Sequence, residues 1–267
     1  MLSDITIGQY FPGNSFIHRV DPRVKLGMLF FIIVAIFVLD TRADYAVFCL
    51  VVAALVQSSR LKPNMLLKAL KPLWWILLFT FIIHLFSTPG TSILHVWIFD
   101  MTIEGAEKGF FLCLRLALLI VFSSILTYTT SPLALTDALE EIMSPLKHIG
   151  VPAHELAMMM TIALRFVPTL ISETDKIMRA QRSRGSDFTS GNILERMKRL
   201  VPILVPLFIS SFRRADELAM AMEARCYRGG VGRTRMKEMR ISDTDYMALF
   251  IFAVILVILI GLKAVGI

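Results

Sequence analysis

Five apolar runs separated by polar segments dominate the chain, at residues 26–39, 45–56, 73–86, 109–128 and 246–262. The run at 109–128 is long enough for a helix to cross a bilayer, whereas 26–39 and 45–56 fall short of the roughly 20 residues required. Flanking residues or helix tilt must complete these two runs. We expect them to form two short spans joined by a tight turn, with a buried or re-entrant hairpin as the alternative. The pattern predicts an all-α integral membrane protein with about five transmembrane helices.

Three further helices are predicted in the polar segment 131–240, before the last span. The first begins at Ser131-Pro132 and ends at Gly150, because Pro suits the first position of a helix and Gly the position after its end. The second is apolar at intervals of three and four residues in its first half. A polar break at 185–192 separates it from the third helix, at 193–225. Both long helices are apolar early and charged late, so they are expected to be amphipathic.

Composition agrees with a membrane protein, and charge sets the expected orientation. Apolar residues make up 56% of the chain and charged residues 18%, and the mean hydropathy of +0.68 exceeds that of ordinary soluble proteins. The net charge is +7, and short basic loops of membrane proteins face the cytoplasm. Segment 57–72 has four bases and no acid, whereas 87–108 has three acids and one base. We therefore expect the N-terminus, 57–72 and 131–240 to be cytoplasmic and the C-terminus to be outside.

The charge pattern also predicts how the chain is divided. Residues 1–130 are expected to hold an N-terminal cytoplasmic segment and four spans, 131–240 the cytoplasmic helices, and 241–267 the last span. No basic segment leads directly into a short apolar stretch at the N-terminus, so no cleaved signal peptide is predicted. Asp21-Pro22 predicts a helix start, with Asp21 as the capping residue.

A repeated pattern ends the two long helices, at Ser183-Arg184-Gly185 and at Ala224-Arg225-Cys226. In each copy an aspartate, Asp175 or Asp216, lies nine residues before the arginine, about 13 Å along a helix. Glu223 adds a further charge at the second end. An arginine at a projecting helix end can bond carboxylates or helix-end carbonyls in a partner protein. A basic residue at a helix C-terminus is often only a solvated cap, but its repetition favours docking.

At these residues the chain resembles the T component of energy-coupling factor (ECF) transporters, whose cytoplasmic coupling helices end in two Ala-Arg-Gly-like motifs. Both arginines are present, while Ser183 and Cys226 depart from the strict triplet. The N-terminal string from Gly13 to Leu26, Gly-Asn-Ser-Phe-Ile-His-Arg-Val-Asp-Pro-Arg-Val-Lys-Leu, is similar to the family's opening signature. The resemblance covers essentially the whole chain.

The resemblance implies a transmembrane scaffold in the cell membrane of a prokaryote, part of an importer for a vitamin or a transition-metal ion. Its partners would be two ATP-binding-cassette ATPases and a substrate-binding membrane subunit, the S component. Each arginine would lie in a groove of one ATPase. The ATPases would use ATP and magnesium, and this chain would bind no cofactor of its own.

The apolar face of the second long helix is the expected contact for the S component. Its members lie at helical spacing and are rich in methionine, which packs against irregular partners: Leu156, Met159, Met160, Ala163 and Leu164. The same side chains could instead cover the spans of this chain.

A stand-alone secondary transporter with cytoplasmic regulatory helices is the main alternative. Such a protein needs ionisable groups within the membrane, and the apolar runs offer chiefly His84 and Arg115, with no acid beside either. We interpret His84 as a satisfied polar residue and Arg115 as a cation reaching toward the interface.

Enzymatic and nucleic-acid-binding functions are not favoured. His154-Glu155 lacks the second histidine of a His-Glu-x-x-His zinc motif, the three cysteines have no metal-ligand spacing, and no phosphate-binding Gly-x4-Gly-Lys-Ser/Thr motif occurs. No catalytic residue and no metal site are therefore predicted. The basic residues of 228–240 fit a segment beside anionic lipid better than a nucleic-acid site.

Overall fold

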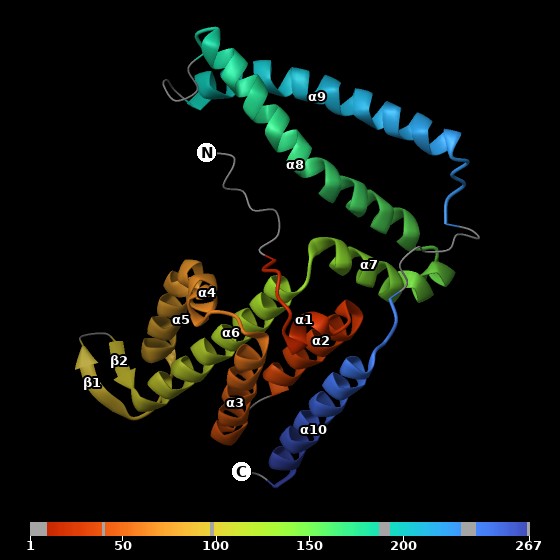
Figure 1. The fold of residues 1–267 in the computed structure, drawn as a ribbon. Coiled ribbons are helices and arrows are strands. Elements are labelled where there is room, and N and C mark those ends of the chain that lie inside the picture. The colour runs from red at the N-terminus through yellow and green to blue at the C-terminus, as the bar shows by residue number, and fades with distance from the viewer. Residues whose placement is uncertain (1–9, 39–40, 97–98, 187–192, 231–238, 266–267) are drawn as a thin grey trace. The chain divides into compact units, whose positions relative to one another are not determined.

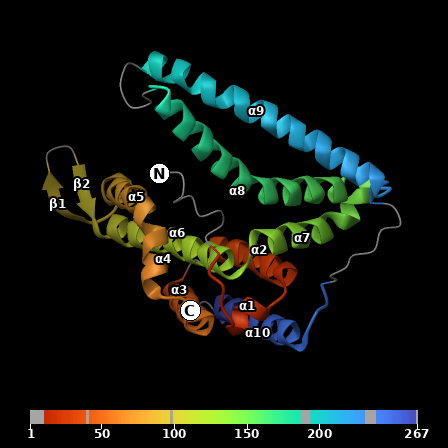
Figure 2. The same cartoon turned by 45° about the horizontal axis from the view of Figure 1, so that its top comes forward.

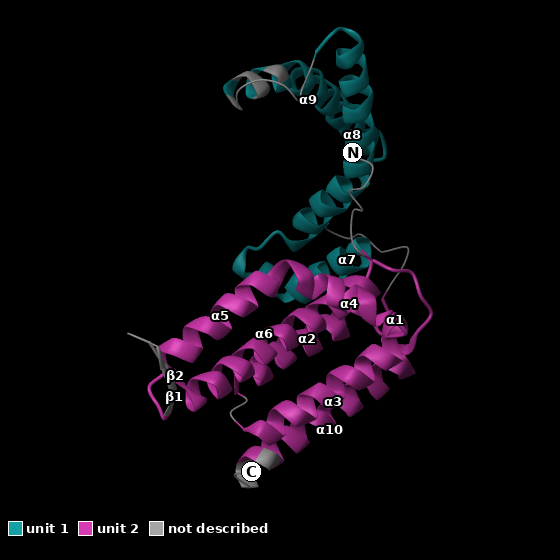
Figure 3. Ribbon diagram, turned by 90° about the vertical axis from the view of Figure 1, so that its left-hand side faces the viewer, with its two compact units in different colours: residues 1–8, 132–237 teal, residues 9–131, 238–267 magenta. Residues whose placement is uncertain are grey.

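A computed structural model describes residues 10–38, 41–96, 99–186, 193–230 and 239–265. The chain forms two compact units, coloured separately in Figure 3. Unit 1 comprises residues 1–8 and 132–237, and unit 2 comprises residues 9–131 and 238–267. The chain therefore passes between the units three times.

Unit 2 contains most of the apolar helices, and Figure 1 labels its elements. Its elements are α1 (Phe16–Arg19), α2 (Pro22–Val38), α3 (Arg42–Ser59), α4 (Pro63–Leu70), the 3-10 turn η1 (Lys71–Leu73), α5 (Trp74–Ser87), β1 (Ser92–Val96), β2 (Phe99–Thr102), α6 (Ile103–Thr129) and α10 (Asp243–Val265). Unit 1 contains α7 (Pro132–Met143), the 3-10 turn η2 (Ser144–Ile149), α8 (Ala153–Ser183) and α9 (Ile193–Ala224).

The prediction of an all-α integral membrane protein with about five spans is confirmed. Within the described residues, five helical segments are long and apolar enough to cross a bilayer: α3, the continuous segment Pro63–Ser87, α6, α8 and α10. Two memberships differ from the predicted set. Helix α2, which covers residues 26–38 of the first predicted run, is not among the five because its described part has 17 residues. Helix α8 is among them because its first half is apolar enough to match a span in composition.

Two segments predicted as loops are partly structured. Most of the basic segment 57–72 is helical, because α3 extends to Ser59 and α4 begins at Pro63, the favoured residue for a first turn. Segment 87–108 contains the antiparallel pair β1–β2, followed by the first turns of α6. The Thr102 hydroxyl accepts a hydrogen bond from the Gly105 amide and so caps α6.

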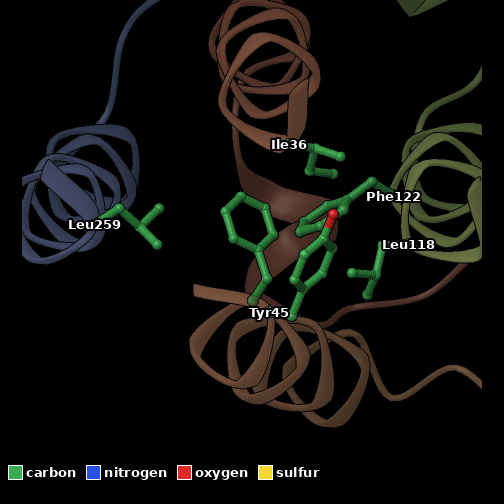
Figure 4. Close-up of a cluster of buried hydrophobic side chains, with 6 residues drawn as sticks. Ile36, Tyr45, Leu118, Phe122 and Leu259 are labelled. Atoms are coloured by element: carbon green, nitrogen blue, oxygen red, sulfur yellow. The ribbon is translucent and has the colours of Figure 1, made fainter. Parts of the chain in front are cut away.

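Helix α6 is the centre of unit 2 and packs against α2, α3, α4 and α5. A cluster of buried side chains from four helices forms the core (Figure 4): Ile36, Tyr45, Phe48, Leu118, Phe122 and Leu259. A second cluster, around Ile17, Leu61 and Tyr128, lies at the end of α6 where that helix terminates. Uniformly apolar helices thus bury one side against each other and leave the rest for lipid.

Two glycines one helical turn apart allow α5 and α6 to approach closely. A Cβ atom added to Gly105 would lie 2.6 Å from the carbonyl oxygen of His84, and one added to Gly109 would lie 3.2 Å from Phe81. Membrane helices commonly use such small residues at contacts where backbones touch. Gly105 therefore sets the separation of these two helices.

The two polar residues considered for a secondary transporter have partners within unit 2. His84 is hydrogen-bonded through Nδ1 to the Thr80 carbonyl one turn earlier, at 3.0 Å, as expected of a satisfied polar residue. Arg115 donates from Nε to the Tyr45 hydroxyl near the start of α3, at 3.0 Å. That it reaches toward the membrane interface stays a prediction.

Candidate docking sites at two helix ends

The first arginine motif forms the cap of α8. The Ser186 amide donates to the Gln181 carbonyl at 3.0 Å, and the Gly185 amide donates to the Arg182 carbonyl at 2.9 Å. These two bonds define a Schellman motif, in which Arg184 is the C-cap residue and Gly185 follows it in the left-handed conformation, with φ of +85°.

The second motif repeats this geometry at the end of α9. The Tyr227 amide donates to the Met222 carbonyl at 3.0 Å, and the Cys226 amide donates to the Glu223 carbonyl at 2.8 Å. Arg225 is again the C-cap residue, and Cys226 is left-handed with φ of 55°. The two triplets are therefore equivalent in three dimensions, residue by residue.

This geometry explains the residue types of the triplets. The third position must adopt a left-handed backbone, which costs a residue with a Cβ atom about 1–2 kcal/mol and costs glycine little. Gly185 suits that position, whereas Cys226 occupies it under strain. The departure at Cys226 therefore changes the energy of the second cap but not its shape.

Both arginines are exposed, as are Ser183 and Ala224 immediately before them. A cation at a helix C-terminus is favoured by the partial negative charge of the last carbonyls. The guanidinium groups have no hydrogen bond or ion pair to any other residue of the described ranges. Each helix thus presents a cationic end that is available to a partner.

The aspartates of the repeat do not contact the arginines. Asp175 is half-buried on α8 and Asp216 is exposed on α9, each nine residues before its arginine. Glu223 is exposed and contributes its backbone carbonyl to the second cap. A supporting role for these three acids at the helix ends stays a prediction.

An ion pair that the sequence analysis missed joins α8 and α9. Arg214 Nη2 lies 2.8 Å from Glu173 Oε2, and the Ser210 hydroxyl donates to Glu173 Oε1. Farther along, Gln181 Nε2 lies 3.5 Å from the Pro202 carbonyl, so the helices run antiparallel (Figure 2). Sequence patterns do not reveal a pair that lies about forty residues apart. We call Glu173 and Arg214 the crossing pair.

The crossing pair lies midway between the two arginine ends along the helices. Arg184 follows Glu173 by eleven residues, and Arg225 follows Arg214 by eleven. Each end is therefore about 16 Å beyond the pair. Because the helices are antiparallel, the two ends lie at opposite extremes of the α8–α9 pair.

A small polar network attaches the second end to the start of α8. The Tyr227 hydroxyl lies 2.9 Å from Met158 Sδ and 3.5 Å from His154 Nε2. His154 Nδ1 in turn lies 3.0 Å from Glu140 of α7. The residue that completes the second Schellman motif thus contacts α8 directly and is linked to α7 through His154.

Two exposed apolar stripes run along unit 1. The predicted contact residues Leu156, Met159, Met160 and Ala163 are exposed on α8, and Leu164 is half-buried. A second stripe lies on α9, where the sequence predicted an amphipathic helix without naming the residues of its apolar face. It has the same spacing of three and four residues: Val201, Leu204, Val205, Phe208 and Phe212. That spacing was the signal that could have identified it. Contiguous exposed apolar surface indicates a partner or lipid.

A cavity of about 520 Å³ in unit 2 has an almost wholly apolar lining, contributed by α1, α2, α3, α6 and α10. Its polar lining residues are Lys25, Ser58 and Thr129, and the ammonium group of Lys25 donates to the Thr129 carbonyl. Among the described residues, no cluster of His, Cys, Asp and Glu could hold a metal ion.

Comparison with known proteins gives a consistent family. A family model described as CbiQ, cobalt transport protein, matches residues 13–238. The chain is 53% identical over 266 residues to the energy-coupling factor transporter transmembrane protein EcfT of Acidaminococcus fermentans, covering 98% of each chain. It is 44% identical over 265 residues to EcfT of Bacillus subtilis, covering 99% of this chain and all of that relative.

Proposed function

The chain belongs to the family of energy-coupling factor transporter transmembrane proteins, and from this premise we propose that α8 and α9 couple two ATPases to a substrate-binding S component. The observation that carries the proposal is the pair of equivalent helix ends, each a Schellman motif with an exposed arginine as its C-cap. Two equivalent cationic ends on one chain suit two related ATPase subunits.

We infer that each arginine docks in a groove of one ATPase. The guanidinium fork can form paired hydrogen bonds with a carboxylate or with carbonyls at a helix end. The tight Schellman turn ends the helix one residue later, so the cation projects from a blunt tip that can enter a groove. ATP and magnesium would be bound by the ATPases.

The crossing pair suggests how movement is transmitted. When the ATPases close on ATP, the two arginine ends would move relative to each other, and α8 and α9 would rotate about the contact of Glu173 with Arg214 and Ser210. Eleven residues separate each arginine from the crossing pair, and we call these two segments the arms of α8 and α9. Because the arms are equal in length, the same displacement of either ATPase would rotate its helix by the same angle. The stripes on α8 and α9 would then shift beneath the S component, the subunit that selects the vitamin or transition-metal ion.

The test of docking is a pair of charge-removing variants, Arg184→Ala and Arg225→Ala, co-expressed with the two ATPases and an S component. We expect normal membrane insertion, loss of ATPase co-purification and loss of uptake of radiolabelled biotin or cobalt ion by cells. Arg179→Ala and Arg213→Ala remove exposed arginines from the same helices away from the caps, so they serve as matched controls. A double cap variant that assembles and transports normally would disprove the proposal.

The orientation is tested by labelling single cysteines in a chain whose native cysteines are replaced. Asn64 and Thr91 are both exposed, on α4 and beside β1. With α8 and α9 in the cytoplasm, a membrane-impermeant maleimide should label Thr91→Cys in intact cells. It should label Asn64→Cys only after permeabilisation. The reverse pattern would invert the topology and remove both arginines from the ATPases.

A further inference from the structure

A group of buried charged side chains lies where the ends of α2, α6 and α10 meet in unit 2. Asp21, Lys25 and Asp245 are 7%, 6% and 1% exposed. Burying charge is costly unless each group is paired or hydrogen-bonded, so their partners define what the group does. Those partners lie beside the places where the chain passes between the two units.

Asp245 fixes the return of the chain into α10. Its Oδ1 accepts the Asp21 amide at 2.6 Å, and its Oδ2 accepts the amide and hydroxyl of Ser242 at 2.7 and 2.9 Å. The start of α10 is therefore held against the residue that precedes α2. Asp21 in turn caps α2 by accepting the Arg23 amide at 2.8 Å, as the sequence predicted.

Arg23 and Lys25 hold described residues of unit 2 that lie beside two of the connections. Arg23 Nη2 pairs with Asp21 at 2.8 Å and donates to the Met239 carbonyl at 3.0 Å, just after the chain returns from unit 1. Lys25 Nζ donates to the carbonyl of Thr129 at 3.2 Å and the hydroxyl of Thr130 at 3.3 Å, just before the chain leaves for unit 1.

Described residues after the third passage are held in the same region. The Phe11 amide donates to the Tyr128 carbonyl at 2.9 Å, and the His18 ring lies 3.0 Å from the Phe11 carbonyl. Described residues of unit 2 beside all three passages are thus held at one end of that unit. Burial raises the pKa of Asp21, but its hydrogen bonds with Arg23 and the charges of Arg23 and Lys25 outweigh this and lower the pKa. Asp21 is therefore ionised at neutral pH.

Stability alone gives no reason for this group to be ionic. Buried ion pairs can often be replaced by apolar side chains of similar volume without loss of stability, and their distinctive contribution is to fix one geometry. Here the fixed geometry is that of the connections to unit 1. We propose that Asp21, Arg23, Lys25 and Asp245 form a clasp that anchors these connections, so that movement of α8 and α9 reaches the S component undiminished.

The proposal rests on the coupling function above, and it assigns these residues a positioning role. Its test compares assembled complexes of Lys25→Met and Asp245→Asn, measuring co-purified ATPase, ATP hydrolysis and uptake of radiolabelled biotin or cobalt ion. We expect the ATPases to co-purify and hydrolyse ATP, while uptake per ATP falls at least about five-fold, the lower range of coupling between sites. Lys62→Met and Asp243→Asn change exposed charges and should leave the ratio unchanged.

The outcomes separate the clasp from a merely structural role. Unchanged uptake per ATP would overturn the clasp, and so would losses of uptake and hydrolysis that only follow the amount of complex. Failure of the docking proposal is a separate result, because it would appear as normal ATPase co-purification with the Arg184→Ala and Arg225→Ala variants. The pair Asp21→Cys and Asp245→Cys, with native cysteines replaced, adds a rescue test. Oxidation to a disulfide should restore coupling and reduction should remove it, whereas equal coupling in both states would contradict the proposal.

Discussion

Replacing Cys226 by glycine should strengthen the cap of α9, because glycine is the residue that the left-handed position favours. The φ of 55° at Cys226 lies near the centre of the left-handed region, so its cost is about 1 kcal/mol, the lower end of the usual range. Glycine loses about 0.5 kcal/mol more chain entropy on folding. The net gain is about 0.5 kcal/mol, roughly a two-fold shift in the opening equilibrium of the cap.

The converse change, Gly185→Ala, should weaken the cap of α8. At φ of +85° the added Cβ costs about 1–2 kcal/mol, reduced by the regained entropy to about 1 kcal/mol, roughly a five-fold shift. No atom lies within 4 Å of that Cβ, so backbone conformation alone sets the cost.

Hydrogen exchange of the two caps, measured by mass spectrometry on the purified chain, tests both values. Peptides that contain the capping amides of Cys226 and Tyr227 should exchange about two-fold more slowly in Cys226→Gly. Peptides containing the amide of Gly185 should exchange about five-fold faster in Gly185→Ala. Cys226→Ala keeps a Cβ at the left-handed position and should match the native chain. If Cys226→Ala slowed exchange as much as Cys226→Gly, backbone strain would not be the cause.

Three further changes test packing, pairing and charge. Gly105→Ala should lower the free energy of unfolding of unit 2 by about 1–3 kcal/mol, as measured by thermal denaturation, because its Cβ would meet the His84 carbonyl. Gly27→Ala is the control, since open space surrounds its added Cβ and it should not destabilise the unit. Equal effects of the two changes would reject the close contact. A double-mutant cycle with Glu173→Gln and Arg214→Gln should give a coupling energy of about 1 kcal/mol that falls with salt, and zero coupling would reject the crossing pair. The lowered pKa of Asp21 stabilises the fold at pH values above about 3.9, the pKa of an aspartate in the unfolded chain, and this contribution is lost as pH falls through the folded pKa. The protection of amides in residues 19–24, measured relative to their intrinsic exchange rates at each pH, should therefore fall below about pH 4 in the native chain and fall less in Asp21→Asn; an equal loss of protection in both would reject this charge effect.

Much of unit 1 could be predicted because its boundaries depend on local backbone chemistry. Pro132 begins α7 and the polar break after Gly185 precedes α9, as the sequence indicated. Gly150 also ends the helical segment as predicted, although its last part, Ser144–Ile149, is the 3-10 turn η2 and not a continuation of α7. Each of these residues acts through its own φ or its missing amide hydrogen. Such effects need no knowledge of distant partners.

The features that sequence analysis missed depend on contacts between distant residues. The crossing pair joins segments far apart in the chain, and so does the hydrogen bond from Lys25 to Thr129. None of these four residues lies in a sequence motif that would identify its partner. The strands β1 and β2 are too short to show an alternating pattern. Helix α2 is apolar but has only 17 residues, whereas α8, predicted as a cytoplasmic helix, is long and apolar enough to match a span. The apolar runs alone therefore do not predict which helices are long enough to cross a bilayer.

The equal arms of α8 and α9 restrict how the lengths of these helices can change during evolution. Adding one residue between Glu173 and Arg184 would turn the arginine by about 100° and leave Arg225 unchanged. Adding seven would keep its direction within about 20° but lengthen that arm by about 10 Å. Insertions among relatives should therefore fall in the segments after Gly185 and Cys226, or occur as matched heptads in both helices. A family alignment can be searched for this signature without any further structure.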